Sequence, residues 1–204
     1  MEHSHHSCLA LFVLQGEPMK TTSIQTLAWF GAVMAALVLA SAAPNESTVM
    51  GKLPTLTAKK LDQGTVNLPE GLPAGRTLAL VAFHKGHRGE IDSWIDGLNL
   101  RQDASIAWVR MPVLDDPGTE KARADIESRL HARHVTSLDR DRLLPVFTNR
   151  DAFLRSTGMS NTDHAWVLVI GRDGQVLAKV QGHYHHDKAQ ALRETLVASN
   201  SLVF

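Results

Sequence analysis

Runs of apolar residues separated by polar turns divide most of the chain into alternating strands and helices. Two uninterrupted apolar runs, residues 78–83 and 166–170, are typical of strands that are covered on both faces of a sheet. After the first run and a short polar loop, apolar residues recur at helical spacing at Ile91, Trp94, Ile95 and Leu98. We therefore expect a buried strand that leads through this loop into an amphipathic helix.

The rest of the pattern continues this alternation. The expected elements are a strand over 106–113, a helix with Ala122, Ile126 and Leu130 on its buried face, a short strand over 143–147, a helix ending at Gly158, and a final helix with Ala189, Leu192 and Leu196 on its buried side. Asp173 and Gly174 predict a turn between strands over 166–170 and 176–181, which gives an antiparallel hairpin. We predict an α/β domain with a central mixed sheet, helices on both faces, and a C-terminal β-hairpin plus helix.

The N-terminal part of the chain has the features of a secretory signal peptide over residues 19–42. Lys20 supplies positive charge, residues 27–39 are apolar, and residues 40–42 form a small-x-small cleavage site. We expect residues 1–18 to lie upstream of the true start. Cleavage would leave an extracytoplasmic, for example periplasmic, protein with no stable membrane anchor. An uncleaved anchoring helix is the alternative, although 13 apolar residues are fewer than the roughly 20 of a membrane span.

The mature chain is then a single domain, with an exposed lead-in over residues 43–60 and the folded part over residues 61–204. The full chain has 21 basic and 21 acidic residues, and no segment forms a basic stripe, which excludes a nucleic-acid-binding protein. Cys8, the only cysteine, precedes the predicted cleavage site. Without a thiolate, the mature protein cannot carry out disulfide exchange by itself.

Three stretches resemble a thioredoxin-like domain of the redoxin or TlpA type. LALVAF with the following loop and helix is similar to the family's first core strand and active-site helix, LLPVFTNRDAFLRSTGM to its insert, and AWVLVIGRDGQVL to its strand–turn–strand. The resemblance extends over about residues 61–198. It implies a thioredoxin-like fold in which the loop before the first helix faces the loop before the hairpin.

The chain lacks both halves of this family's redox site. The CxxC pair would fall within residues 88–92, which contain no cysteine, and the position of the cis-proline falls near Ala165. We therefore exclude thiol oxidoreductase and peroxidase activity. No other set of nucleophile, base and orienting residue stands out. The favoured hypothesis is a non-enzymatic binding or assembly protein whose partner is a protein or a small anion.

Two narrower families share single features with the chain. It resembles the Sco copper chaperones in Asp163-His164, because His164 stands where that family has a histidine ligand. The positions of the two cysteine ligands of that family fall near Arg88 and Asp92, so both are absent. The chain is also similar to the thioredoxin-like ATP-synthase assembly factors of mitochondria and bacteria, in a phenylalanine-led loop and a helix with a tryptophan such as Trp94.

Two candidate sites follow for the loop before the first helix. The fold implied by the resemblance brings His84 and His87 toward His164, and three imidazoles are suited to zinc or copper. A small anion is the other candidate ligand, favoured at the helix N-terminus by the run of Lys85, His87, Arg88 and Gly89. No other cofactor is expected. Two plainer interpretations stay open: solvent-exposed loop histidines, and basic residues that only complement an acidic first helical turn.

Overall fold

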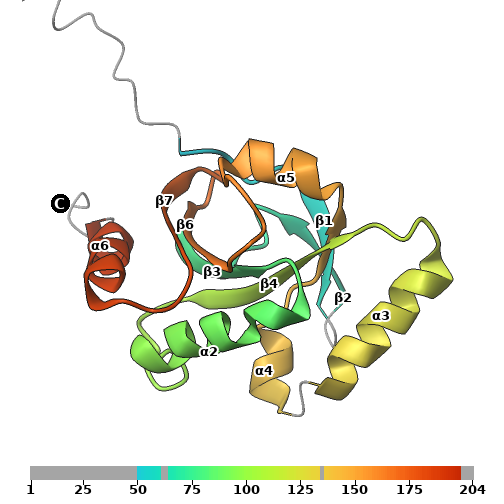
Figure 1. The fold of residues 1–204 in the computed structure, drawn as a ribbon, viewed down its shortest axis with the longest axis horizontal. Helices are drawn as coiled ribbons and strands as arrows, with labels where there is room; N and C mark the ends of the chain where they lie inside the picture. The colour runs from blue at the N-terminus through green and yellow to red at the C-terminus, as the bar shows by residue number, and fades with distance from the viewer. Residues whose placement is uncertain (1–49, 61–63, 134–135, 199–204) are drawn as a thin grey trace, which may run out of the picture. The chain divides into compact units, whose positions relative to one another are not determined.

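Figure 1 shows a computed structural model of the protein, which describes residues 50–60, 64–133 and 136–198. These residues form a five-stranded sheet in the order β5-β4-β3-β6-β7 and a separate two-stranded sheet. The strands are β1 (Leu56–Lys60), β2 (Gly64–Leu68), β3 (Arg76–Ala82), β4 (Trp108–Asp115), β5 (Val146–Thr148), β6 (Trp166–Gly171) and β7 (Val176–Gln181). The helices are η1 (Lys85–His87), α2 (Arg88–Gly97), α3 (Glu120–Arg133), α4 (Ser137–Asp141), α5 (Arg150–Thr157) and α6 (His186–Val197).

The predicted upstream segment and signal peptide, residues 1–18 and 19–42, lie outside the described residues. Their boundaries and the cleavage of the signal peptide stay predictions. Among the helices that are described, none combines the length and the apolar character that crossing a membrane requires.

β3 lies at the centre of the five-stranded sheet and joins its parallel and antiparallel halves. It pairs in parallel with β4, for example Leu78 with Trp108, and antiparallel with β6, for example Val81 with Trp166. β5 extends the parallel half and β7 the antiparallel half. Residues 78–81 are fully buried because both edges of β3 are paired and both of its faces are covered. The predicted α/β domain with a mixed sheet is confirmed.

Each face of this sheet has its own covering layer. On one face, side chains such as Leu80 and Val167 pack against α2 and α6. On the other face, Val81 and Met111 pack against α5 and against the β1-β2 hairpin. Figure 1 shows α2 and α5 on opposite sides of the sheet. The predictions of helices on both faces and of a C-terminal hairpin followed by a helix are therefore confirmed.

The segment over residues 43–60, predicted as an exposed lead-in, contributes to the core in its described part. Leu53 and Ala58 are buried in the same cluster as Val81. The N–H of Leu53 donates to the carbonyl of Gly174 at 2.8 Å, which attaches the segment to the turn between β6 and β7. The strand β1 forms here because β2 supplies its hydrogen-bonding partners. This part of the chain is therefore not an exposed lead-in.

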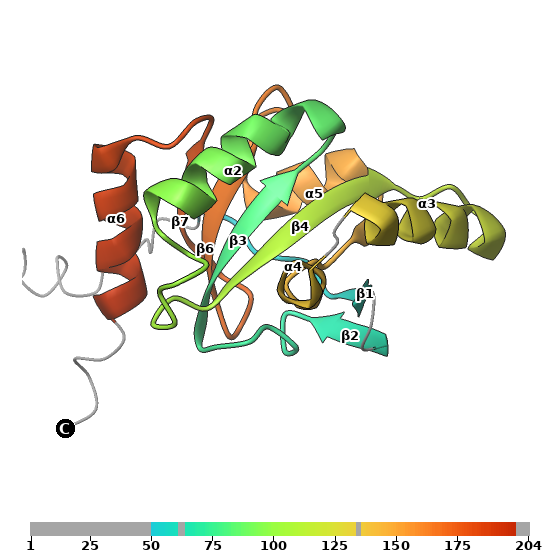
Figure 2. The same ribbon diagram turned by 90° about the horizontal axis from the view of Figure 1, so that it is seen from below.

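The helix α3 differs from the expected buried helix. None of its residues is buried, and Ala122, Ile126 and Leu130 are each half-buried. The expectation of a buried face is wrong because Ile126 and Leu130 are the only large apolar side chains among 14 positions, half of which are charged. An ion pair of 2.9 Å between Lys59 Nζ and Glu127 Oε2 links α3 to β1. Figure 2 shows α3 beyond β4, on the far side of the domain from α6.

The helix α2 is held in place mainly by Trp94. This side chain is fully buried, and its Nε1 donates to the carbonyl of Gly182 at 2.7 Å. The ring of Tyr184 packs edge-on against the indole, with ring centroids 5.3 Å apart, and the N–H of Tyr184 donates to Ser93 Oγ at 3.0 Å. These contacts attach α2 to the connection between β7 and α6, and thereby set the position of the first turn of α2.

Two glycines of α2 provide a matched test of this packing. A Cβ atom at Gly97 would lie 2.5 Å from the Tyr184 ring, whereas a Cβ atom at Gly89 would have no neighbour within 4 Å. Gly97→Ala should lower the free energy of unfolding by about 1–2 kcal/mol, because the clash outweighs the gain from removing a helical glycine. Gly89→Ala should raise it by about 0.5–1 kcal/mol. Urea unfolding followed by circular dichroism measures both, and equal effects would contradict the packing.

Candidate functional site

The loop between β3 and α2 is built around its two histidines. His84 Nδ1 accepts the N–H of Gly86 at 3.1 Å, which opens the 3-10 turn η1. His87 Nδ1 accepts the N–H of Phe83 at 3.2 Å. The centroids of the two imidazole rings lie 3.7 Å apart. Both side chains therefore stabilise the loop through their Nδ1 atoms.

His87 is 2% exposed and lies beneath the loop rather than on its surface. Because its Nδ1 accepts from Phe83, we assign the ring proton to Nε2. Nε2 has no acceptor in hydrogen-bonding geometry among the described residues, although the carbonyl of Asp163 is near enough to affect the ring. Burial first, and His84 second, lower the pKa of His87 below its ordinary 6.5, against weaker opposition from Glu90 and Asp163. His87 is therefore neutral at neutral pH.

Glu90 connects the first turn of α2 to the loop before β6. Its Oε1 lies 2.8 Å from His164 Nδ1, and its Oε2 accepts the N–H of Ala165 at 2.5 Å. Burial by itself would raise the pKa of Glu90, but the hydrogen bonds from His164 and Ala165 outweigh it and hold the pKa below its ordinary 4.5. We call this arrangement of Glu90, His164 and Ala165 the Glu90 clamp. The two loops therefore face each other, as the resemblance implies.

The three candidate metal ligands come near one another, but their Nδ1 atoms are engaged. His84 and His87 each accept a backbone N–H at this atom, and His164 Nδ1 faces Glu90. In the described part of the chain, no three or more histidine, cysteine, aspartate or glutamate side chains are arranged to hold a metal ion. A metal at these histidines would have to bind their Nε2 atoms.

The candidate anion-binding run is divided between two environments. Lys85 and Arg88 are exposed and line a pocket. His87 is buried beneath the loop, and Gly89 is exposed but lies outside the pocket lining. The run does not form one surface because the turn of η1 directs His87 inward while its neighbours point outward. Of the predicted residues, Lys85 and Arg88 are therefore the ones that a ligand of this pocket would meet.

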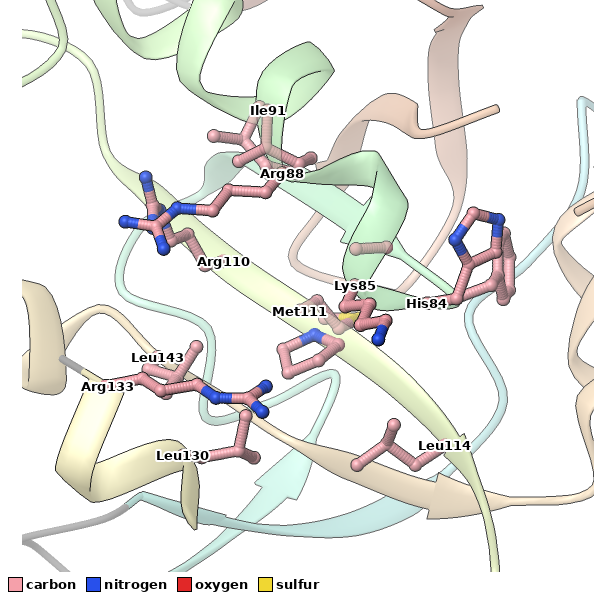
Figure 3. Close-up of a pocket in the computed structure, with 14 residues that line it drawn as sticks. His84, Lys85, Arg88, Ile91, Arg110, Met111, Leu114, Leu130, Arg133 and Leu143 are labelled. Atoms are coloured by element: carbon pink, nitrogen blue, oxygen red, sulfur yellow. The ribbon is translucent and has the colours of Figure 1, made fainter. Parts of the chain in front are cut away.

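The pocket has a volume of about 420 Å³ and lies over β4, beside the start of α2 (Figure 3). Its apolar lining residues are Leu80, Ala82, Phe83, Ile91, Met111, Pro112, Leu114, Leu130 and Leu143. Its nitrogen-bearing lining residues are His84, Lys85, Arg88, Arg110 and Arg133. We call it the basic pocket. The basic pocket exists because α3 does not cover β4. Arg110, Pro112 and Leu114 are only half-buried on this face of the sheet, while Val113 on the other face is buried.

The positive charge in the basic pocket is only partly balanced. Asp92 Oδ1 lies 2.5 Å from Arg110 Nη2, and Asp92 Oδ2 lies 3.5 Å from Arg88 Nε. One carboxylate therefore serves two guanidinium groups. Lys85 and Arg133 form no ion pair with any described residue. The Arg110 side chain is 11% exposed, so water shields its charge poorly.

Sequence reasoning missed the contributions of β4 and α3 to this pocket. Arg110 is the only charged residue in the otherwise apolar stretch 106–113, and this signal could have identified it. Leu130 and Arg133 gave no comparable signal. Their approach to β4 depends on the path of the chain between β4 and α3, which periodicity does not reveal.

No protein family model matches the chain, and no curated protein matches it in sequence. Among solved structures, it is similar to a candidate electron transfer protein from Aquifex aeolicus VF5, with a TM-score of 0.52 and 12% identity over 74% of this chain and 95% of that chain. For a candidate electron transport protein of the same organism, the TM-score is 0.51 and the identity 11%, over 74% and 99%. For BsSco, a member of the Sco family of cytochrome c oxidase assembly proteins, the TM-score is 0.45 and the identity 16%, over 74% of this chain and 95% of that chain.

At such low identities, these similarities concern the fold. The parallel β3-α2-β4 unit, followed by the antiparallel β6-β7 hairpin and α6, has the order and directions of a thioredoxin-like domain. The domain is therefore thioredoxin-like. Residues 88–92, where the CxxC pair would fall, contain an ion pair of 3.5 Å between Arg88 and Asp92, and the place expected for the cis-proline is near Ala165 of the Glu90 clamp.

Glu90→Gln tests the Glu90 clamp. The variant keeps the shape of the side chain but removes its charge, so the free energy of unfolding at neutral pH should fall by about 1–3 kcal/mol. Because the pKa of Glu90 is lowered in the folded state, its contribution is complete above 4.5 and is lost as the pH falls through the folded-state value. Urea unfolding should show the two proteins converging in stability below about pH 4. A difference that is independent of pH would contradict the clamp.

His87→Asn tests the neutral, buried imidazole, because asparagine can still accept from Phe83 but does not titrate. Below about pH 6.5 the unfolded parent takes up a proton that the folded parent resists, so the parent loses stability until the pH reaches the folded-state pKa. The variant is less stable than the parent overall because the packing of the imidazole ring is gone. Its free energy of unfolding should nevertheless fall less than that of the parent as the pH is lowered through this interval. Urea unfolding at several pH values measures the difference, and His183→Asn controls for the loss of an exposed histidine. Equal losses in parent and His87→Asn would disprove the assignment.

Proposed function

We propose that this protein is an extracytoplasmic, non-redox binding or assembly protein that uses the basic pocket of its thioredoxin-like domain to hold an anionic group of a ligand or partner protein. The observation that carries the proposal is the composition of the pocket lining. Among the described residues, this lining contains four lysine or arginine side chains and no carboxylate. A concave, mainly apolar site with a few convergent polar groups is the usual form of a ligand-binding site.

The electrostatics of the pocket supports an anionic ligand. Arg88 and Arg110 share the single carboxylate of Asp92, and Lys85 and Arg133 add two further positive charges. An incoming carboxylate or phosphate would complete the hydrogen bonding of the guanidinium groups, which suit such planar or multivalent anions. The attraction is strengthened because apolar walls reduce the screening by water.

The absence of thiols supports a function without disulfide chemistry. Cys8 is the only cysteine of the chain, and residues 88–92, where the CxxC pair would fall, contain none. A thiolate is the required nucleophile of disulfide exchange, and no side chain of this window supplies one. The proposed extracytoplasmic location rests on the signal peptide predicted over residues 19–42.

Copper or zinc binding through His164 with His84 or His87 is the alternative that the sequence raises. It is supported by the approach of the two loops, which places His164 near enough to His87 to affect its pKa. Stoichiometric copper or zinc in the purified protein, lost on His164→Ala, would favour this alternative over the anion-binding proposal.

Isothermal titration of the purified protein with inorganic phosphate tests the proposal. We expect millimolar or tighter affinity in the parent, lowered about tenfold in the double variant Lys85→Ala/Arg88→Ala because two charge-assisted contacts are lost. The double variant Lys121→Ala/Arg172→Ala removes the same charge away from the pocket and should bind like the parent. No detectable binding by the parent, or an equal loss in both double variants, would overturn the proposal.

A further inference from the structure

Apart from His84, the walls of the basic pocket are either apolar or cationic. Among the described residues, its lining contains no serine, threonine, asparagine, glutamine or tyrosine. The backbone of Arg110 beneath it is already paired, because its N–H donates to the carbonyl of Arg142 at 2.7 Å and its carbonyl accepts the N–H of Leu144 at 2.8 Å. Pro112 has no N–H to offer. A ligand would therefore meet hydrocarbon surface and positive charge.

This lining discriminates between two kinds of anionic ligand. A peptide carries an N–H and a carbonyl at every residue, and burying these groups without partners is unfavourable. A hydrocarbon chain has no such groups, and each methylene that leaves water for apolar surface stabilises the complex. The chemistry of the walls thus favours a ligand that is apolar except for one anionic end.

Two of the guanidinium groups of the pocket lie away from one of its leucines. Figure 3 shows Arg88 and Arg110 at one end and Leu114 at the other. Leu130 of α3 lies across from β4 and contributes an apolar side chain that the rest of the domain leaves half-buried. The guanidinium pair at one end, with Leu114 and Leu130 further along the pocket and Arg133 beside Leu130, can accept a carboxylate head followed by an alkyl chain.

We propose that the basic pocket binds a free long-chain monocarboxylic acid, with the carboxylate at Arg88 and Arg110 and the alkyl chain between Leu114 and Leu130. This inference rests on the proposed function and specifies the class of anion. The volume of about 420 Å³ lies within the range of small-molecule sites. α3 is then one wall of a ligand site, and the ligand would cover the apolar side chain of Leu130.

The test is a titration series of straight-chain carboxylates from butyrate through octanoate to dodecanoate, below their micelle-forming concentrations. We expect the affinity of the parent to rise about threefold to fourfold for each added methylene until the pocket is filled. Leu130→Gln should flatten this rise, because it makes the apolar wall polar. Ile126→Gln, a half-buried position of the same helix outside the pocket lining, should leave the rise unchanged.

Three control ligands identify the class and the source. Dodecyltrimethylammonium has the same chain with the opposite charge and should not bind. Phosphatidylglycerol vesicles should not displace dodecanoate; displacement would overturn the assignment to a free acid in favour of a membrane lipid. A short acidic peptide with leucine side chains should bind more weakly than dodecanoate, and tighter binding would overturn the inference.

The two proposals can fail separately. Equal affinity for butyrate and dodecanoate, with phosphate binding still dependent on Lys85 and Arg88, overturns the long-chain acid and leaves the proposed function standing. If neither phosphate nor any carboxylate binds, both are overturned. A rise with chain length that Leu130→Gln does not reduce would also overturn the placement of the alkyl chain.

Discussion

The position of the first turn of α2 depends on one carboxylate. Glu90 is 12% exposed, and a carboxylate so poorly hydrated is unfavourable unless its oxygens have partners. Here both oxygens have partners in the loop before β6, at His164 and the N–H of Ala165. With Trp94 attaching the middle of the helix to Gly182, α2 is fixed relative to two separate connections of the sheet. The loop from β3 must therefore reach a helix whose start is already positioned.

This constraint divides the region equivalent to the thioredoxin-like redox site into a closed and an open side. On the closed side, His87 lies buried beneath the loop and the Glu90 clamp occupies the place opposite the helix. On the open side, Arg88 and Asp92 extend toward Arg110 and border the basic pocket. The two loops thus meet, and hydrogen bonds and an ion pair occupy the place where they meet.

Much of the fold could be predicted from periodicity, whereas the site could be predicted only in part. The buried run 78–83, the helical stripe that includes Trp94 and the hairpin turn were all recognisable because each is a local pattern. Lys85 and Arg88 were recognisable as cations beside a helix start. The burial of His87 was not, because it depends on an acceptor interaction with Phe83 within a turn of only three residues. The prediction of a buried face on α3 was wrong, because a short row of apolar residues at helical spacing does not show whether another element packs against it.

By itself, the sequence determined the order of strands and helices, the mixed sheet, the absence of cysteine from residues 88–92, and the presence of basic residues at the start of α2. These features depend on the spacing and chemistry of neighbouring residues. Only the tertiary structure decided that Glu90 holds the loop at Ala165, that His87 faces inward, and that Arg110 and Arg133 complete a pocket with Lys85 and Arg88. The physical reason is that such contacts join residues far apart in the chain, and their geometry is set by which faces of the sheet are covered and which are left open.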